Sequence, residues 1–111
     1  MQAYKNKDFL WEHLQQVPPF RALVRSVESK LFIEVGEIYS PALDLGCGDG
    51  QFASVTFDKP FDSGIDPDKQ SVAVAQLSNS YISLHQGDAT AMPFEDNMFA
   101  SVVSNCVLEH I

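Results

Sequence analysis

The residues best suited to chemistry lie at four places, each directly after a short apolar run. The segment 44–50 (Asp-Leu-Gly-Cys-Gly-Asp-Gly) combines two carboxylates with a glycine-rich turn. Asp66 and Asp88 follow the next two apolar runs, and Asn105 ends a fourth. Glycines let a backbone turn sharply and approach a ligand without interference from a Cβ atom. Carboxylates attract positive charge and accept hydrogen bonds, so the pattern favours a polar, cationic ligand.

The same apolar runs predict the elements that position these residues. The predicted strands are 41–45, 61–65, 81–85 and 100–106. Helical patterns begin at Gln51 and at Pro67. Strands that alternate with helices indicate βαβ units, a parallel sheet and an α/β fold. Because parallel α/β sheets bind ligands beyond the carboxyl ends of their strands, we expect the residues named above to converge on one edge.

A helical segment precedes the sheet. A short helix is predicted over 7–16, and Pro18 and Pro19 end it and suit the first turn of a second helix. Apolar residues recur in the second helix at the spacing of an amphipathic helix. These residues are Phe20, Leu23, Val24, Val27, Leu31 and Val35. The predicted organisation is therefore an N-terminal helical segment, 1–39, and a ligand-binding core, 40–111.

The glycine turn differs from the dinucleotide fingerprint Gly-x-Gly-x-x-Gly. Gly46 and Gly48 fit that pattern, but position 51 is Gln and the third glycine comes one residue early, at Gly50. Asp44 and Asp49 flank the turn and would repel a pyrophosphate. These departures disfavour a nicotinamide-dependent oxidoreductase. A ligand that carries an ammonium and a sulfonium beside one carboxylate would instead be attracted.

Four segments resemble the motifs of class I S-adenosylmethionine-dependent methyltransferases, in the same order. Segment 44–50 resembles their first motif, and 64–67 (Gly-Ile-Asp-Pro) resembles the second. Residues 86–94, with Gln-Gly-Asp-Ala followed by Met-Pro-Phe, are similar to the third. Residues 104–110 are similar to the fourth-strand segment of the small-molecule branch called methyltransferase type 11. The resemblance covers about residues 40–111.

The resemblance implies a role for individual residues. Gly46 and its neighbours would wrap the methionine part of S-adenosylmethionine, and Asp66 would hold the ribose. Asp88 and the backbone of Ala89 would meet the adenine edge, with Asn105 close to the methionine. The full set implied for cofactor binding is Asp44, Gly46, Cys47, Gly48, Gly50, Asp66, Pro67, Asp88, Ala89 and Asn105.

The resemblance also implies a fold. It is a Rossmann-like parallel sheet with helices on both faces, in which the strands present here would have the order 3-2-1-4. The family sheet has seven strands and this sequence supplies four, so we expect the C-terminal half of the fold to be absent. The predicted fourth strand would then lie at an open edge, which proteins normally cover. A homodimer through that edge is expected.

Composition narrows the function classes. The chain has 111 residues and a net charge of −8, which disfavours nucleic acid and anionic membranes as partners. Its two cysteines, Cys47 and Cys106, match neither a disulfide framework nor a zinc site, so no metal is expected. With no signal-peptide pattern, a cytoplasmic location is expected.

The sequence is compatible with two functions. The first is a methyltransferase that acts on a small molecule by in-line displacement at the sulfonium methyl group. The second is a non-catalytic cofactor-binding fragment or interaction module. No residue is assigned a catalytic role: Cys47 suits a small filler between glycines, and His13 and His85 show no partner pattern. The methylated atom, whether oxygen, nitrogen or carbon, also stays open.

Overall fold

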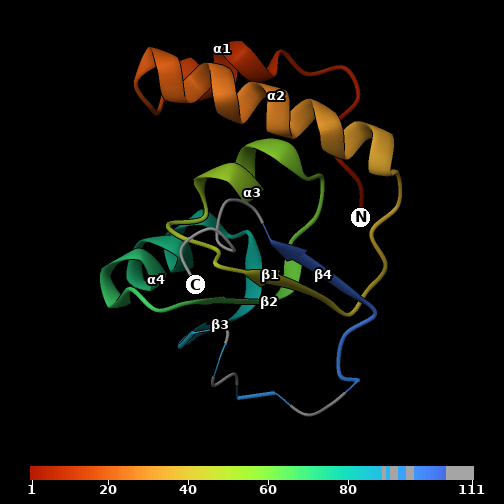
Figure 1. Cartoon of the computed structure of the whole chain (residues 1–111), viewed down its shortest axis with the longest axis vertical. Coiled ribbons are helices and arrows are strands. Elements are labelled where there is room, and N and C mark those ends of the chain that lie inside the picture. Colours follow the sequence, from red (N-terminus) through yellow and green to blue (C-terminus); the bar gives the residue numbers. More distant parts are fainter. Residues whose placement is uncertain (89, 91–92, 95–96, 105–111) are drawn as a thin grey trace.

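A parallel four-stranded sheet forms the centre of the chain in the computed structural model, which describes residues 1–88, 90, 93–94 and 97–104. The strands are β1 (Ala42–Leu45), β2 (Phe61–Asp66), β3 (Tyr81–Gln86) and β4 (Ser101–Ser104). Their order is β3-β2-β1-β4, with every neighbouring pair parallel (Figure 1). The expected Rossmann-like sheet with order 3-2-1-4 is confirmed.

Four helices accompany the sheet in the part of the chain that is described. They are α1 (Phe9–Leu14), α2 (Pro19–Val35), α3 (Gln51–Thr56) and α4 (Lys69–Ala75), which continues as a 3-10 turn, Gln76–Ser78. The carboxylate of Asp8 caps α1 by accepting from Trp11 N. Asp68 caps α4 by accepting from Gln70 N, so this helix begins two residues after the predicted start at Pro67. None of the helices described is long and apolar enough to cross a membrane.

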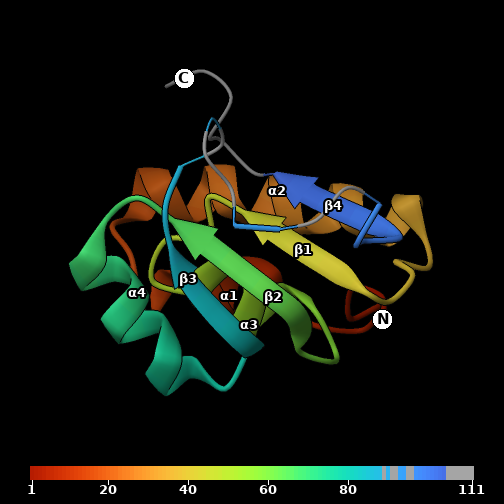
Figure 2. The ribbon, with the colours of Figure 1, turned by 90° about the horizontal axis from the view of Figure 1, so that it is seen from below.

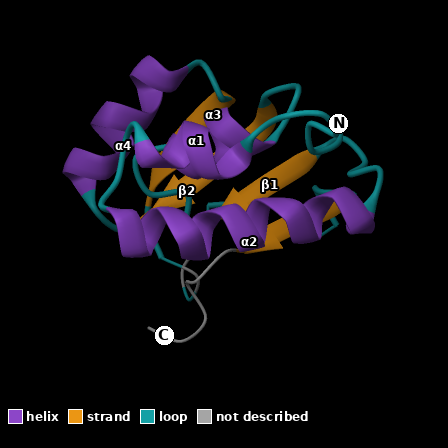
Figure 3. Cartoon of the chain, turned by 90° about the horizontal axis from the view of Figure 1, so that it is seen from above, coloured by secondary structure: helices purple, strands orange, loops and turns teal. Residues whose placement is uncertain are grey.

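The described helices gather on one face of the sheet, as Figures 2 and 3 show from opposite sides. The core between helices and sheet is aromatic. The ring centre of Phe57, in the segment after α3, lies 5.2 Å from the ring centre of Phe32 of α2 and 5.2 Å from that of Phe61 of β2. On the opposite face Ile82 and Val102 are exposed. A second layer of helices stays a prediction, and so does a homodimer through β4, which lies at one end of the described sheet.

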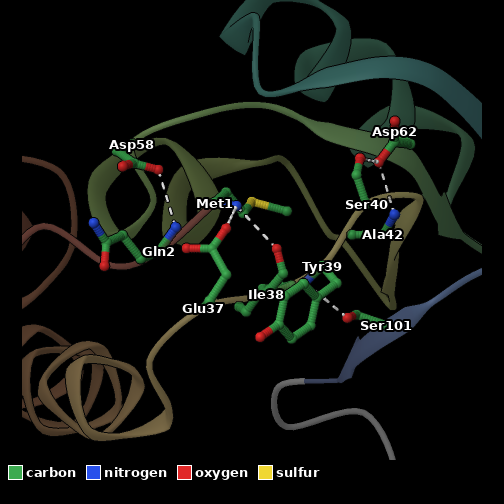
Figure 4. Close-up of polar contacts among 10 residues, drawn as sticks. All are labelled: Met1, Gln2, Glu37, Ile38, Tyr39, Ser40, Ala42, Asp58, Asp62 and Ser101. Atoms are coloured by element: carbon green, nitrogen blue, oxygen red, sulfur yellow. Dashed lines mark hydrogen bonds and ion pairs between the residues drawn. The ribbon is translucent and has the colours of Figure 1, made fainter.

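Polar contacts hold the segment that leads from α2 into β1 (Figure 4). Asp62 of β2 accepts hydrogen bonds from Ser40 Oγ at 2.5 Å and from Ala42 N at 2.7 Å. Tyr39 N donates to Ser101 Oγ of β4 at 3.0 Å. These bonds connect the segment after α2 and the start of β1 to both neighbouring strands.

The chain's first residues pack against the same region. The Met1 ammonium contacts Glu37 Oε1 at 2.6 Å and donates to Ile38 O at 2.9 Å (Figure 4). Ala3 forms an isolated antiparallel bridge with Phe57. The first three residues therefore lie between the end of α2 and the end of α3.

Helix α2 forms as predicted, but the apolar residues of its predicted stripe point away from the core, which Phe32 of the same helix contacts. The face that meets its neighbours carries small residues, and Ala22, Ser26 and Ser29 are buried. The large apolar residues predicted to form the helix stripe are exposed, up to 80% at Phe20. Small side chains let helix axes approach closely, which is why this narrow face rather than the apolar one lies against α1 and α3.

Gly64 of β2 provides a test of packing beneath the site. A Cβ atom at this position would lie 2.7 Å from Tyr81 Cδ1, and the Tyr81 ring is held by a stacked contact with Phe61. We expect Gly64→Ala to lower the free energy of unfolding by about 1–3 kcal/mol, measured by urea denaturation. In a Tyr81→Leu background the same substitution should cost much less, because the ring is gone. Equal costs in both backgrounds would contradict this explanation.

Candidate functional site

The glycine turn lies between the carboxyl end of β1 and the start of α3. Gly46, Gly48 and Gly50 have φ angles of 74°, 58° and 81°. These values lie in the left-handed region that residues with a Cβ atom rarely adopt. Gly46 N and Cys47 N donate to Ile65 O of β2 at 2.8 and 3.0 Å, so the turn folds back over the neighbouring strand.

Asp66 at the end of β2 joins two loops. Its Oδ2 accepts from Gly48 N at 2.9 Å, and its Oδ1 accepts from Asp68 N at 2.9 Å. The carboxylate therefore fixes the glycine turn relative to the loop before α4. Each carboxylate oxygen has a further lone pair, so the half-buried Asp66 can still accept hydrogen bonds from hydroxyl groups of a ligand.

Asp44 is a buried carboxyl in the middle of the sheet edge. Its Oδ2 accepts from the Tyr81 hydroxyl at 2.5 Å. Burial raises the pKa of Asp44 to about 6, the hydrogen bond from Tyr81 opposes this rise, and the nearby charge of Asp66 adds to it. Burial and the Asp44 charge also raise the pKa of the Tyr81 hydroxyl far above its usual value, so Tyr81 stays protonated and donates. A cation placed beside Asp44 would relieve its unfavourable charge.

Cys47 lies between two glycines of the turn. Burial, followed by the charges of Asp44 and Asp66, raises the pKa of its thiol to about 12. The thiol is therefore protonated at neutral pH and is a poor nucleophile, since the thiolate is the reactive form.

A hollow of about 200 Å³ opens over the turn and brings opposite charges together. Asp44 of β1 and Asp49 of the glycine turn line it on one side, and Arg21 and Arg25 line it from α2. The Arg25 guanidinium also lies 5.6 Å from the centre of the Phe52 ring. The sequence pattern does not single out either arginine, because both lie on a helix far from the turn in the chain. Only the packing of α2 against α3 places them here.

The structure brings together part of the predicted residue set. Asp44, Gly46, Cys47 and Gly48 line the hollow. Gly50 is buried beneath the turn, where an added Cβ would come within 2.7 Å of Ser78 Oγ.

The other predicted residues lie away from the hollow or beyond the description. Pro67 and Asp88 are exposed and do not line it, and Asp88 accepts from Thr90 N at 2.9 Å. Ala89 and Asn105 fall outside the described residues. Their predicted roles remain predictions.

His13 is a further residue at this site, and the sequence assigned it no role. Its side chain is fully buried, and Gln51 of the hollow lies within hydrogen-bond distance of its ring. A lone histidine on a helical pattern gives no signal of this contact, because its partner is 38 positions away along the chain.

Three solved structures with similar folds are a methyltransferase, a protein named YcgJ and an enzyme named for another reaction. An S-adenosylmethionine-dependent methyltransferase from Thermotoga maritima, described as a possible histamine N-methyltransferase, has a TM-score of 0.58 at 17% identity, over 86% of this chain and 45% of its own. The YcgJ protein from Bacillus subtilis has a TM-score of 0.53 at 26% identity, over 70% and 37%. The [4+2]-cyclase SpnF has a TM-score of 0.55 at 25% identity, over 91% and 38%.

These shares mean that the chain spans less than half the length of each of the three structures. A search of curated proteins found no significant match. A family model described as a methyltransferase domain matches residues 43–111, which include the described sheet except Ala42, the glycine turn and Asp66. The chain belongs to this methyltransferase domain family.

Proposed function

We propose that this domain binds S-adenosylmethionine and serves a methyltransferase that acts on a small molecule. The observation that carries the proposal is the hollow over the glycine turn, with carboxylates on one wall and two arginines on the other. The methionine end of the cofactor carries both an ammonium and a carboxylate. A site with both signs of charge is complementary to it, whereas a pyrophosphate would meet Asp44 and Asp49 repulsively.

The size of the hollow supports binding of part of the cofactor there. About 200 Å³ is below the roughly 300–1,000 Å³ of sites that enclose a whole ligand of this size. The methionine end would lie in the hollow, with its carboxylate toward Arg21 and Arg25. The ribose would lie outside it at Asp66, and the adenine beyond that, toward Asp88 and Ala89.

The chain's contribution to chemistry would be binding and orientation. The bound cofactor would supply an electrophilic methyl group on its sulfonium. The glycine turn admits the ligand close to the backbone, since nothing lies within 4 Å of a Cβ atom placed on Gly48. Asp44 and the arginines would hold the two charged groups of the methionine and so orient the sulfonium for in-line displacement. No general base is proposed.

A second candidate is a cofactor-binding module without methyl transfer. It is favoured by the similarity to a [4+2]-cyclase, which shows that this fold also occurs in an enzyme named for another reaction. The two candidates share the binding site and differ in the fate of the methyl group. Transfer of an isotopically labelled methyl group to an oxygen, nitrogen or carbon acceptor would support the first. Binding without transfer to any acceptor class would support the second.

Binding of S-adenosylhomocysteine, measured by isothermal titration calorimetry, tests the site. Asp66→Ala should weaken binding by about 1.5–3 kcal/mol, because it removes a charged acceptor and leaves Gly48 N without its hydrogen-bond partner. Asp68→Ala is the matched control: it removes the α4 cap but leaves the glycine turn untouched. It should cost about 1 kcal/mol of stability and leave affinity unchanged. Equal affinity losses in both variants would argue against the assigned role of Asp66.

The affinity should also depend on pH through Asp44. In the folded, ligand-free chain its pKa is about 6, so the carboxyl is increasingly protonated below that pH. A bound ammonium favours the ionised form, and binding below pH 6 therefore releases a proton. Affinity for S-adenosylhomocysteine should rise by up to about tenfold per unit between roughly pH 5 and 6, then level off.

The Asp44→Asn variant is the control for this pH dependence. Its neutral amide still accepts the Tyr81 hydrogen bond, but it does not titrate. We expect its affinity to be lower at pH 7 and to change little between pH 5 and 7. The same slope in the variant and in the parent chain would assign the titration to another group.

A further inference from the structure

His13 forms a buried hydrogen-bonded chain directly behind the hollow. Its Nε2 lies 2.9 Å from Ser29 Oγ, which lies 2.8 Å from Thr56 Oγ1. Its Nδ1 lies 2.9 Å from Gln51 Nε2. His13, Ser29 and Thr56 are all fully buried, whereas Gln51 is half-buried and lines the hollow. The imidazole thus connects the interior of three helices to one side chain of the ligand site.

The chemistry of the groups determines the direction of the two bonds at the imidazole ring. Burial, followed by the charge of Arg25, lowers the pKa of His13, so the ring is neutral and carries one N–H. The Gln51 amide nitrogen donates to Nδ1, which leaves the ring N–H on Nε2 to donate to Ser29 Oγ. Ser29 Oγ and Thr56 Oγ1 share a further hydrogen bond, in which either hydroxyl can donate. Because the amide nitrogen of Gln51 is engaged by His13, its carbonyl oxygen Oε1 is the end left for the hollow.

We propose that His13 is a positioning residue that holds Gln51 so that Gln51 Oε1 accepts a hydrogen bond from the ammonium of the cofactor's amino-acid part. The inference rests on the proposed function and extends it to two residues outside the family motifs. Gln51 follows the glycine turn directly, and its backbone N donates to Asp49 Oδ1 at 3.0 Å. An ammonium has three N–H donors and needs several acceptors, which Gln51 supplies beside Asp44 and Asp49.

A second contact holds the same region in place. The His13 ring stacks on Phe52, with ring centres 6.0 Å apart and planes within 11°. Phe52 also lines the hollow and lies beneath Arg25. A free glutamine side chain would lose rotamer freedom when it bound a ligand. Because His13 holds it beforehand, that loss is already incurred on folding, which favours binding.

Two substitutions of His13 separate a positioning role from a purely structural one. His13→Asn keeps an acceptor near the position of Nδ1, which can still meet Gln51. His13→Gln keeps a polar group near the position of Nε2, which can still meet Ser29 but not Gln51. Calorimetric titration should show near-normal affinity of His13→Asn for S-adenosylhomocysteine and a loss of about tenfold for His13→Gln. If His13 had only a structural role, His13→Gln would keep more affinity than His13→Asn, because the bond to Ser29 is the more deeply buried of the two.

Gln51→Met tests the ligand end of the chain independently of the buried histidine. It should weaken S-adenosylhomocysteine about tenfold and leave 5′-methylthioadenosine unchanged, because that compound lacks the amino-acid part. In the Gln51→Met background His13→Gln should cause no further loss, because His13 acts through Gln51. Thermal melting of each variant reports folding separately.

The outcomes distinguish this inference from the proposed function. If the parent chain binds neither compound, the proposed function and this inference both fail. If the parent chain binds S-adenosylhomocysteine but the effects of His13→Gln and Gln51→Met are additive, or Gln51→Met weakens both compounds equally, only this inference is overturned. Non-additive losses confined to S-adenosylhomocysteine support it.

Discussion

The glycine turn between β1 and α3 is the constraint from which the site is built. Three of its residues have backbone conformations that favour glycine, and at Gly50 a Cβ would also collide with Ser78. The turn is held from outside by Ile65 O and by the Asp66 carboxylate. Because both partners belong to β2, the pairing of β1 with β2 sets where the turn lies and where α3 begins.

The burial of the Asp44 carboxylate beside this turn disfavours the folded state but favours the binding of a cation. Asp44 is buried within the sheet, which raises its pKa, and Tyr81 supplies one hydrogen bond in partial compensation. A carboxylate held in such surroundings is a feature of ligand sites rather than of ordinary cores. The arginines of α2 face it across the hollow, so an acidic chain presents a locally mixed charge. This mixture suits a zwitterionic group.

Helix α2 shows where prediction from sequence reaches its limit. The spacing of its apolar residues predicts the helix and its bounds correctly, since both follow from local periodicity and from Pro19 and Gly36. It does not predict which face is buried. The small residues around Ser29 lie inside because α1 and α3 approach closely there, whereas Phe20 and Leu23 are exposed. Periodicity describes a helix alone, but burial depends on the shape of its neighbours.

The strands, their parallel direction and the position of the glycine turn could be predicted from patterns in the sequence, whereas the strand order was implied by the resemblance to methyltransferase motifs. Alternating apolar runs and turn residues are local signals, and the crossover rules leave few arrangements of them. Tertiary structure alone decided that Arg21 and Arg25 line the hollow and that His13 reaches Gln51. Those contacts join helices that are distant in the chain, and their geometry depends on side-chain packing, for which a single sequence carries no periodic signal.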